Sequence, residues 1–161
     1  MEQTGRMLEG VVILFGTETG NAEDLAGELR ALFGEHEIEA EVLDLEDVGL
    51  EVMDGSRAVI ICTATHGDGE LPYNSEDFYD ALVRKKPDLG SVRFAVCGLG
   101  DSAYPDFCAA GRTWSHTLTG LGAKEVVERH EIDDGPDDED IQGACEWAER
   151  ALERFRQPVA G

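Results

Sequence analysis

Three continuous apolar runs, each followed by a stretch with helical spacing, constrain the fold of this chain more than any other feature. The runs are VVILFG (11–16), AVIICTA (58–64) and FAVCGLG (94–100). Strands that are apolar on both faces must be covered by helices on both sides, as in parallel sheets. Because apolar strands and helical stretches alternate along the chain, we expect an α/β domain built around a parallel sheet.

Hydrophobic residues spaced by three and four positions predict the helices, with one extending from about 74 to 86. The first inner face is Ala22, Leu25, Ala26, Leu29 and Phe33; a later one is Phe107, Gly111, Trp114, Leu118 and Leu121; the last is Ile141, Cys145, Ala148, Leu152 and Phe155.

Two further segments have the patterns of edge strands. IEAEVLDL (38–45) alternates apolar and charged residues, and KEVVERHEI (124–132) is short and heavily charged. With both at edges, right-handed crossovers favour a five-stranded parallel sheet in the order 2-1-3-4-5, the middle layer of a three-layer sandwich. This order places a topological switch point between the first and third strands, and ligands bind at the carboxyl ends of strands there.

The loop GTETGN (16–21) after the first strand predicts an anion site without a cation. A P-loop would need a lysine and a hydroxyl residue after its second glycine, but Asn21 and Ala22 occupy those positions. Hydroxyl groups and the N–H groups of a helix beginning near Ala22 would bind the anion, because a helix N-terminus carries about half a positive charge. An ordinary helix start, capped by Asn21 with Asp24 three residues later, explains the loop equally well.

Two more glycine-rich loops follow the third and fourth strands. TATHGDGELPYN (63–74) contains His66, and CGLGDSAYPDFC (97–108) contains Tyr104. Taken alone, the first is better explained as a turn with a solvent-facing histidine. Together, the two rings would flank one crevice from neighbouring strands and could enclose a planar ring. A phosphate at one end and a flat heterocycle at the other describe a mononucleotide.

The charge of the chain narrows the choice of partners. With 35 acidic and 13 basic residues, the formal net charge is −22, which would repel nucleic acids and anionic membranes and attract a basic protein. An acidic surface suited to a salty cytoplasm is an equally good explanation. No apolar run approaches the roughly 20 residues of a membrane span, and the N-terminus has no signal pattern, so we expect a cytoplasmic protein.

The four cysteines, Cys62, Cys97, Cys108 and Cys145, lie far apart in the sequence. Their spacing gives no metal-binding pattern, and we expect neither a metal site nor a disulfide framework.

Three stretches at the predicted strand ends resemble the FMN-binding loops of the flavodoxin family: FGTETGNAEDLA, TATHGDGELPYNSEDFYDAL and VRFAVCGLGDSAYPDFCAAG. They are similar to MioC-like short-chain flavodoxins and to the FMN domains of sulfite reductase and cytochrome P450 reductase. The resemblance covers residues from about 8 to 156 and implies a single flavodoxin-like domain over 1–161. Flavodoxin is itself a standard example of the switch-point rule, so that rule adds no independent support here.

The resemblance implies FMN as a tightly bound cofactor, with no catalytic residue and no metal. It assigns the phosphate loop to Thr17, Glu18, Thr19, Gly20, Asn21 and Ala22. It assigns one face of the flavin ring to Ala64, Thr65, His66 and Gly67, and the other face to Leu99, Gly100, Asp101, Tyr104, Phe107 and Cys108, with Tyr104 stacking on the ring. His66 departs from the reductase domains, which often have a tyrosine there.

The function implied is that of an electron carrier, not an enzyme, which passes single electrons between a reductase and an acceptor. We expect a monomer that meets basic-surfaced partners transiently through acidic residues such as Asp68, Glu70, Asp101 and Asp106. The alternative is an FMN-dependent NAD(P)H:quinone or flavin reductase, and a signalling receiver domain is a third and weaker one. Met1 and the short tail favour a free-standing protein.

Overall fold

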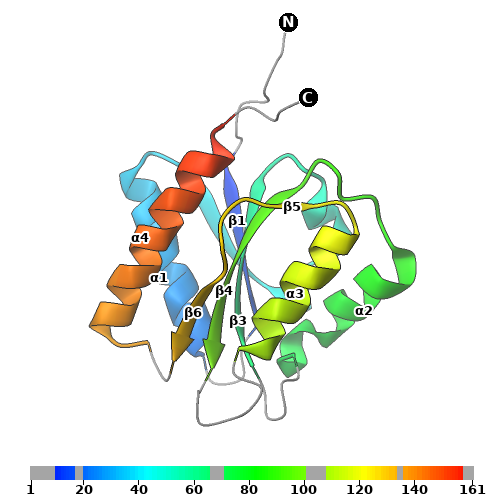
Figure 1. The fold of residues 1–161 in the computed structure, drawn as a ribbon, viewed down its shortest axis with the longest axis horizontal. Coiled ribbons are helices and arrows are strands. Elements are labelled where there is room, and N and C mark those ends of the chain that lie inside the picture. Colours follow the sequence, from blue (N-terminus) through cyan, green and yellow to red (C-terminus); the bar gives the residue numbers. More distant parts are fainter. Residues whose placement is uncertain (1–9, 17–19, 66–70, 101–107, 134–135, 158–161) are drawn as a thin grey trace, which may run out of the picture.

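The fold was obtained as a computed structural model, which describes residues 10–16, 20–65, 71–100, 108–133 and 136–157. Strands and helices alternate along the chain (Figure 1). The strands are β1 (Val11–Gly16), β2 (Ala40–Asp44), β3 (Ala58–Ala64), β4 (Arg93–Gly100), β5 (Lys124–Glu125) and β6 (His130–Asp133). The α-helices are α1 (Asn21–Glu35), α2 (Glu76–Lys85), α3 (Ala109–Gly120) and α4 (Asp138–Phe155), with short 3-10 helices η1 (Leu45–Asp47), η2 (Leu50–Met53) and η3 (Tyr73–Ser75).

The strands form one parallel sheet in the order β2-β1-β3-β4-β5, which confirms the predicted order and fold class. Val11 of β1 pairs with Ala40 of β2 on one side and with Ala58 of β3 on the other. All of β1 is buried, whereas β2 at the edge is only partly buried, as its alternating pattern indicates. The strand that is buried on both faces thus lies inside the sheet, and the partly buried strand lies at its edge.

The fifth predicted strand, 124–132, was expected to be continuous, and the structure divides it. β5 and β6 both pair with β4, but residues 126–129 lie opposite only Ala95 and Val96. The Val126 N–H still donates to Phe94 O at 3.0 Å, and the indole Nε1 of Trp147 in α4 donates to Glu128 O at 2.8 Å. The Trp147 side chain of α4 therefore satisfies a backbone carbonyl in the segment 126–129, between β5 and β6.

Two separate cores lie on the two faces of the sheet. Helices α1 and α4 cover one face, and α2 and α3 cover the other (Figure 1). Successive residues of β1 alternate between them: Val11 and Ile13 face α1 and α4, whereas Val12 and Leu14 face α2 and α3. Each core contains one fully or nearly fully buried tryptophan, which is Trp147 on the first face and Trp114 on the second.

Three helices differ in detail from the prediction. The inner face of α4 includes Ala144, Trp147 and Ala151, whereas the predicted Ile141 and Cys145 are only partly buried. Leu121, predicted on the inner face of α3, follows the helix and is also only partly buried. The helix predicted from about 74 to 86 is α2, which begins at Glu76 after the 3-10 turn η3.

Candidate cofactor site at the carboxyl edge of the sheet

The carboxyl ends of β1, β3 and β4 lie side by side at one edge of the sheet. Gly16 pairs with Thr63, and Ala64 pairs with Leu99. From β1 the chain crosses to β2 on one side, and from β3 it crosses to β4 on the other, so the predicted switch point lies between β1 and β3. The helices begin at this same edge (Figure 1). The topology thus gathers three loop starts and several helix N-termini in one place.

The start of α1 has a backbone suited to an anion. Gly20 precedes the helix with φ of 94°, in the left-handed region that favours glycine, and its carbonyl accepts from the Asp24 N–H at 2.9 Å. Apart from its chain neighbours, no described residue has an atom within 4 Å of the position that a Cβ would take on Gly20. The cap is therefore Gly20 and not Asn21, which is already the first helical residue.

The donor set at this helix start fits a phosphate group. A helix N-terminus supplies N–H donors and a partial positive charge, which bind a phosphate without a cationic side chain. Asn21 is exposed, and the methyl group of Ala22 is buried in the core, where it anchors the helix. Of the predicted phosphate loop, Thr17, Glu18 and Thr19 lie outside the described residues, and their roles stay predictions.

Asn74 links the ends of the first two strands to the chain that follows β3. Its Nδ2 donates to Asp44 Oδ1 at 2.7 Å and lies 3.5 Å from Phe15 O. Asp44 Oδ1 also accepts from the Glu46 N–H at 2.8 Å, which caps η1. The prediction missed this role of Asn74, because its partners are 30 and 59 residues away in the sequence.

Gly16 ends β1 where neighbouring side chains leave little room. A Cβ on Gly16 would lie 3.2 Å from Ser75 Oγ and 3.4 Å from Leu45 Cδ1. The buried Ser75 hydroxyl donates to Pro72 O at 2.8 Å, which fixes the turn before α2. The close approach lets η3 pack directly over the end of β1.

Thr65 connects the end of β3 to β4 and to α3. Its N–H donates to Leu99 O at 3.1 Å, and its Oγ1 accepts from the Ala110 N–H at 3.2 Å. Thr65 was predicted to lie on one face of the flavin ring. The structure shows that its hydroxyl bonds to the first turn of α3.

Cys108 is the cap residue of α3 and is fully buried. It has φ of 55°, and its Sγ lies 4.0 Å from Ile132 O, a long and weak hydrogen bond in which the thiol donates. Burial, reinforced by the nearby Glu131 carboxylate, raises the pKa of the Cys108 thiol to about 12. The thiol is therefore protonated at neutral pH, and the role predicted for Cys108 toward the cofactor stays a prediction.

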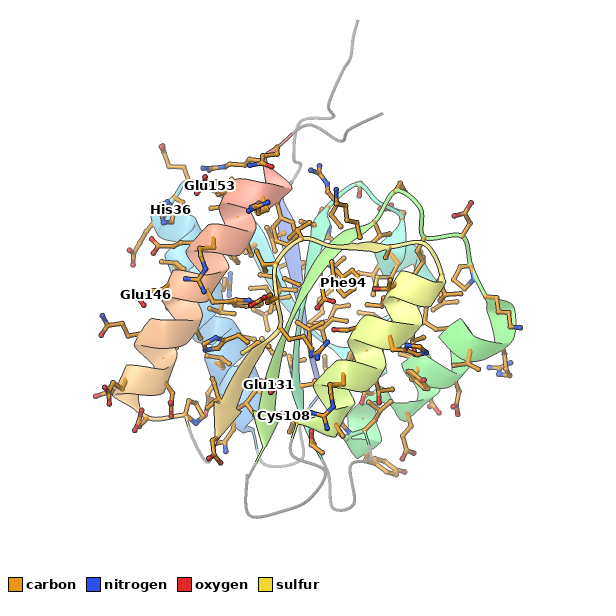
Figure 2. The ribbon with its side chains drawn as sticks, viewed as in Figure 1. His36, Phe94, Cys108, Glu131, Glu146 and Glu153 are labelled. Atoms are coloured by element: carbon orange, nitrogen blue, oxygen red, sulfur yellow. The ribbon has the colours of Figure 1, made fainter. Side chains whose placement is uncertain are left out.

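Figure 2 shows Glu131 of β6 next to Cys108, near the start of α3. The Glu131 carboxylate lies 3.7 Å from the Arg112 guanidinium and 3.9 Å from Arg129 Nε. These partly exposed ion pairs are worth little individually. They do place two arginines beside the edge strand of an otherwise acidic molecule.

Acidic side chains mark the helix starts at the site edge. The first turn is acidic in α1 (Glu23, Asp24), α2 (Glu76, Asp77) and α4 (Asp138, Glu139, Asp140). Carboxylates at these positions stabilise helices through the helix dipole. The described part of the edge therefore carries a concentrated negative charge around the backbone donors.

The remaining predicted site residues are not placed by the structure. His66, Gly67, Asp101, Tyr104 and Phe107 lie outside the described residues, as do the acidic Asp68, Glu70 and Asp106. The described ones, Gly20, Asn21, Ala22, Ala64, Thr65, Leu99, Gly100 and Cys108, all lie at or next to the carboxyl edge. Over the described ranges, there is no group of three or more potential metal ligands. In the same part of the chain, no helix is long and apolar enough to cross a membrane.

Comparisons with known proteins agree with this arrangement. The sequence model of the flavodoxin family matches residues 13–147. Oxidised flavodoxin 2 from Bacillus cereus superimposes with a TM-score of 0.83 at 31% identity, covering 91% of this chain and 99% of that one. Oxidised flavodoxin 1 from the same organism gives a TM-score of 0.82 at 30% identity, covering 89% of this chain and 97% of that one.

Two curated relatives are much longer proteins. The sulfite reductase [NADPH] flavoprotein alpha-component of Vibrio vulnificus is 32% identical over 151 residues, which cover 93% of this chain and 24% of the relative. The mitochondrial NADP⁺ pyruvate dehydrogenase of Euglena gracilis is 36% identical over 156 residues, covering 88% of this chain and 9% of the relative. The chain thus spans a quarter or less of the length of these relatives.

Proposed function

This chain belongs to the flavodoxin family, whose cofactor is FMN, and we propose that it carries single electrons between a reductase and an acceptor protein. The observation that carries the proposal is the N-terminus of α1, with its left-handed glycine cap, at the same edge of the sheet as the ends of β1, β3 and β4. We propose one FMN-binding domain with a core over residues of about 8–156.

The residues proposed to hold FMN follow the three loops. Thr17, Glu18, Thr19, Gly20, Asn21 and Ala22 would bind the phosphate; Ala64, Thr65, His66 and Gly67 would line one side of the ring; Leu99, Gly100, Asp101, Tyr104, Phe107 and Cys108 would line the other. The α1 N–H groups would offset the phosphate charge, which suits a chain with a formal net charge of −22 and no lysine in this loop. Cys108 would contribute its backbone, since its side chain is buried.

When bound, FMN supplies the redox chemistry, and the protein supplies binding, orientation and electrostatics. The contacts of Asn74 and Thr65 hold the loop starts in fixed positions relative to the sheet. Two tightly packed cores behind the edge give the site a rigid support. The carboxylates at the helix starts would disfavour added negative charge in the site, by about 1–2 kcal/mol for each charge about 10 Å away before salt screening.

The partners proposed are proteins with basic surfaces that bind transiently. The acidic helix starts at the site edge would attract such a partner and orient it toward the cofactor. The names of the long relatives, a sulfite reductase flavoprotein component and an NADP⁺ pyruvate dehydrogenase, support a role in electron transfer. We further propose that the chain acts as a monomer in the cytoplasm.

The test is to titrate the purified chain with FMN and with riboflavin, following the quenching of flavin fluorescence. We expect saturable one-to-one binding of FMN and markedly weaker binding of riboflavin, which lacks the phosphate. Stepwise reduction without oxygen should then proceed in two separate one-electron stages. Absence of FMN binding would refute the proposal, and rapid NAD(P)H oxidation by the isolated chain would favour the quinone or flavin reductase alternative.

A further inference from the structure

One side-chain contact connects two loops of the proposed site through a helix. Thr65 directly follows β3, and its Oγ1 accepts a hydrogen bond from the Ala110 N–H of α3 at 3.2 Å. Its backbone N–H donates to Leu99 O of β4 at 3.1 Å. Residues 101–107 connect β4 to α3, and residues 66–70 begin just after Thr65. The two bonds of Thr65 therefore fix one end of each of these segments.

In the part of the chain that the structure describes, the start of α3 takes its side-chain cap from a residue far away in the sequence. Ala110 is the second residue of the helix, and the first N–H groups of a helix have no partner within it. The cap residue is Cys108, which makes no side-chain hydrogen bond to the helix, and its thiol is directed toward Ile132 O. The first turn of α3 contains no acidic residue, in contrast to α1, α2 and α4. Within the described residues, Thr65 is thus the side chain that caps α3.

The backbone at Cys108 also needs support. Its φ of 55° is a left-handed conformation, which residues other than glycine adopt only where the surrounding structure enforces it. Burial of the Cys108 side chain and the bond from Thr65 to the next turn both act to hold this conformation.

We propose that Thr65 is a positioning residue, whose hydroxyl holds the start of α3 against the end of β3 and so keeps the proposed FMN site in shape. The inference rests on the proposed function, because the ends of β3 and β4 are proposed to flank FMN. It divides the role proposed above for Thr65: its backbone would line one side of the ring, and its hydroxyl acts through α3.

The test compares Thr65→Val, which replaces the hydroxyl with a methyl group of similar size, with Thr65→Ser, which keeps a hydroxyl acceptor. In the FMN-free protein, we expect Thr65→Val to speed hydrogen exchange of the Ala110 amide, measured by NMR. We expect the same variant to bind FMN about 2- to 30-fold more weakly, the range that corresponds to loss of a capping bond. Thr65→Ser should restore both properties, and Thr65→Ala serves if Thr65→Val does not fold.

Thr117→Val is the matched control, because it makes the same chemical change near the other end of α3. Thr117 Oγ1 is hydrogen-bonded to Tyr79 OH at 2.9 Å, away from the site edge. We expect this variant to leave Ala110 exchange and FMN affinity unchanged. If it weakens FMN binding as much as Thr65→Val, the effect is one of general helix stability and the inference is wrong.

Two further outcomes would also overturn the inference. Weaker FMN binding by Thr65→Val with unchanged Ala110 exchange would mean that Thr65 contacts the cofactor directly. Faster Ala110 exchange with unchanged FMN affinity would mean that the cap does not position the site. Failure of the unaltered chain to bind FMN would instead refute the proposed function itself, and the inference with it.

Discussion

Single glycines in this chain have different physical roles, and the structure separates them. Gly20 needs its backbone freedom, since φ is 94° and no described atom crowds the Cβ position. Gly16 needs its small size, because a Cβ would lie 3.2 Å from Ser75 Oγ. Gly27 is exposed within α1, with no described atom within 4 Å of its Cβ position. For these three glycines, only the fold shows which constraint acts on each.

These roles predict opposite effects for the same substitution. Gly20→Ala should lower the free energy of unfolding by about 1 kcal/mol, because alanine is strained at positive φ. Gly27→Ala should raise it by about 0.5–1 kcal/mol, because alanine is the better helix former. Urea denaturation of the two variants measures both values. Equal effects of the same sign would contradict this explanation.

The elements were largely predictable because their patterns are local. The continuous runs 11–16 and 58–64 coincide with β1 and β3. Strands that are buried on both faces are apolar throughout, so the ends of the apolar run mark the ends of the strand. The alternation of Ile38, Ala40 and Val42 with glutamates correctly placed β2 at an edge. Burial, together with the right-handed crossover rule, then gave the strand order.

The parts that sequence patterns did not predict depend on contacts between distant residues. The division of the last strand into β5 and β6 is accompanied by the bond from Trp147 to Glu128 O, 19 residues apart. The capping role of Thr65 depends on Ala110, 45 residues away. Neither bond leaves a periodic signal, because each involves one side chain and one backbone group. The site loops could be placed at one edge, but their mutual supports could not.

The junction of β6 and α4 predicts a pH-dependent stability. The His130 ring stacks on Trp147, with ring centroids 5.9 Å apart. Burial, aided by Arg150 and opposed by Asp140, lowers the pKa of His130 below its ordinary 6.5. Below pH 6.5 the unfolded chain binds a proton at His130 that the folded chain still excludes. Stability from this group is therefore complete above about pH 6.5 and is lost as the pH falls through the lowered pKa.

We expect the free energy of unfolding to fall more between about pH 7.5 and about pH 5.5 in the wild type than in His130→Gln, which cannot titrate there. Parallel curves for the wild type and His130→Gln would show that the burial of His130 does not govern the effect.

Over the whole molecule, charge repulsion opposes folding. The formal net charge is −22, and the few ion pairs found among the described residues are partly exposed. Excess charge of one sign destabilises a compact state, and the Debye length shrinks from about 10 Å at 0.1 M salt to about 3 Å at 1 M. Added salt should therefore screen more repulsion than attraction.

Raising NaCl from about 0.05 M to about 1 M should stabilise the folded chain by at least about 2 kcal/mol, a rise in Tm of about 4–8 °C for a chain of this size. Differential scanning calorimetry measures the shift. Most of it should appear at low salt, where the Debye length changes most, and sulfate salts distinguish screening from the general salting-out of apolar surface. A Tm that stays constant or falls would mean that local ion pairs outweigh the net charge.

The two cores on opposite faces of the sheet also give the molecule two built-in optical reporters. The chain has two tryptophans, and one is buried in each layer. Single-tryptophan variants would emit from Trp147 of α4, between the sheet and the layer of α1 and α4, or from Trp114 of α3, between the sheet and the layer of α2 and α3. Coincident emission changes during denaturation would mean that both layers unfold as one cooperative unit. Separate transitions would reveal a partly unfolded intermediate in which the sheet is still packed against the helices on one face only.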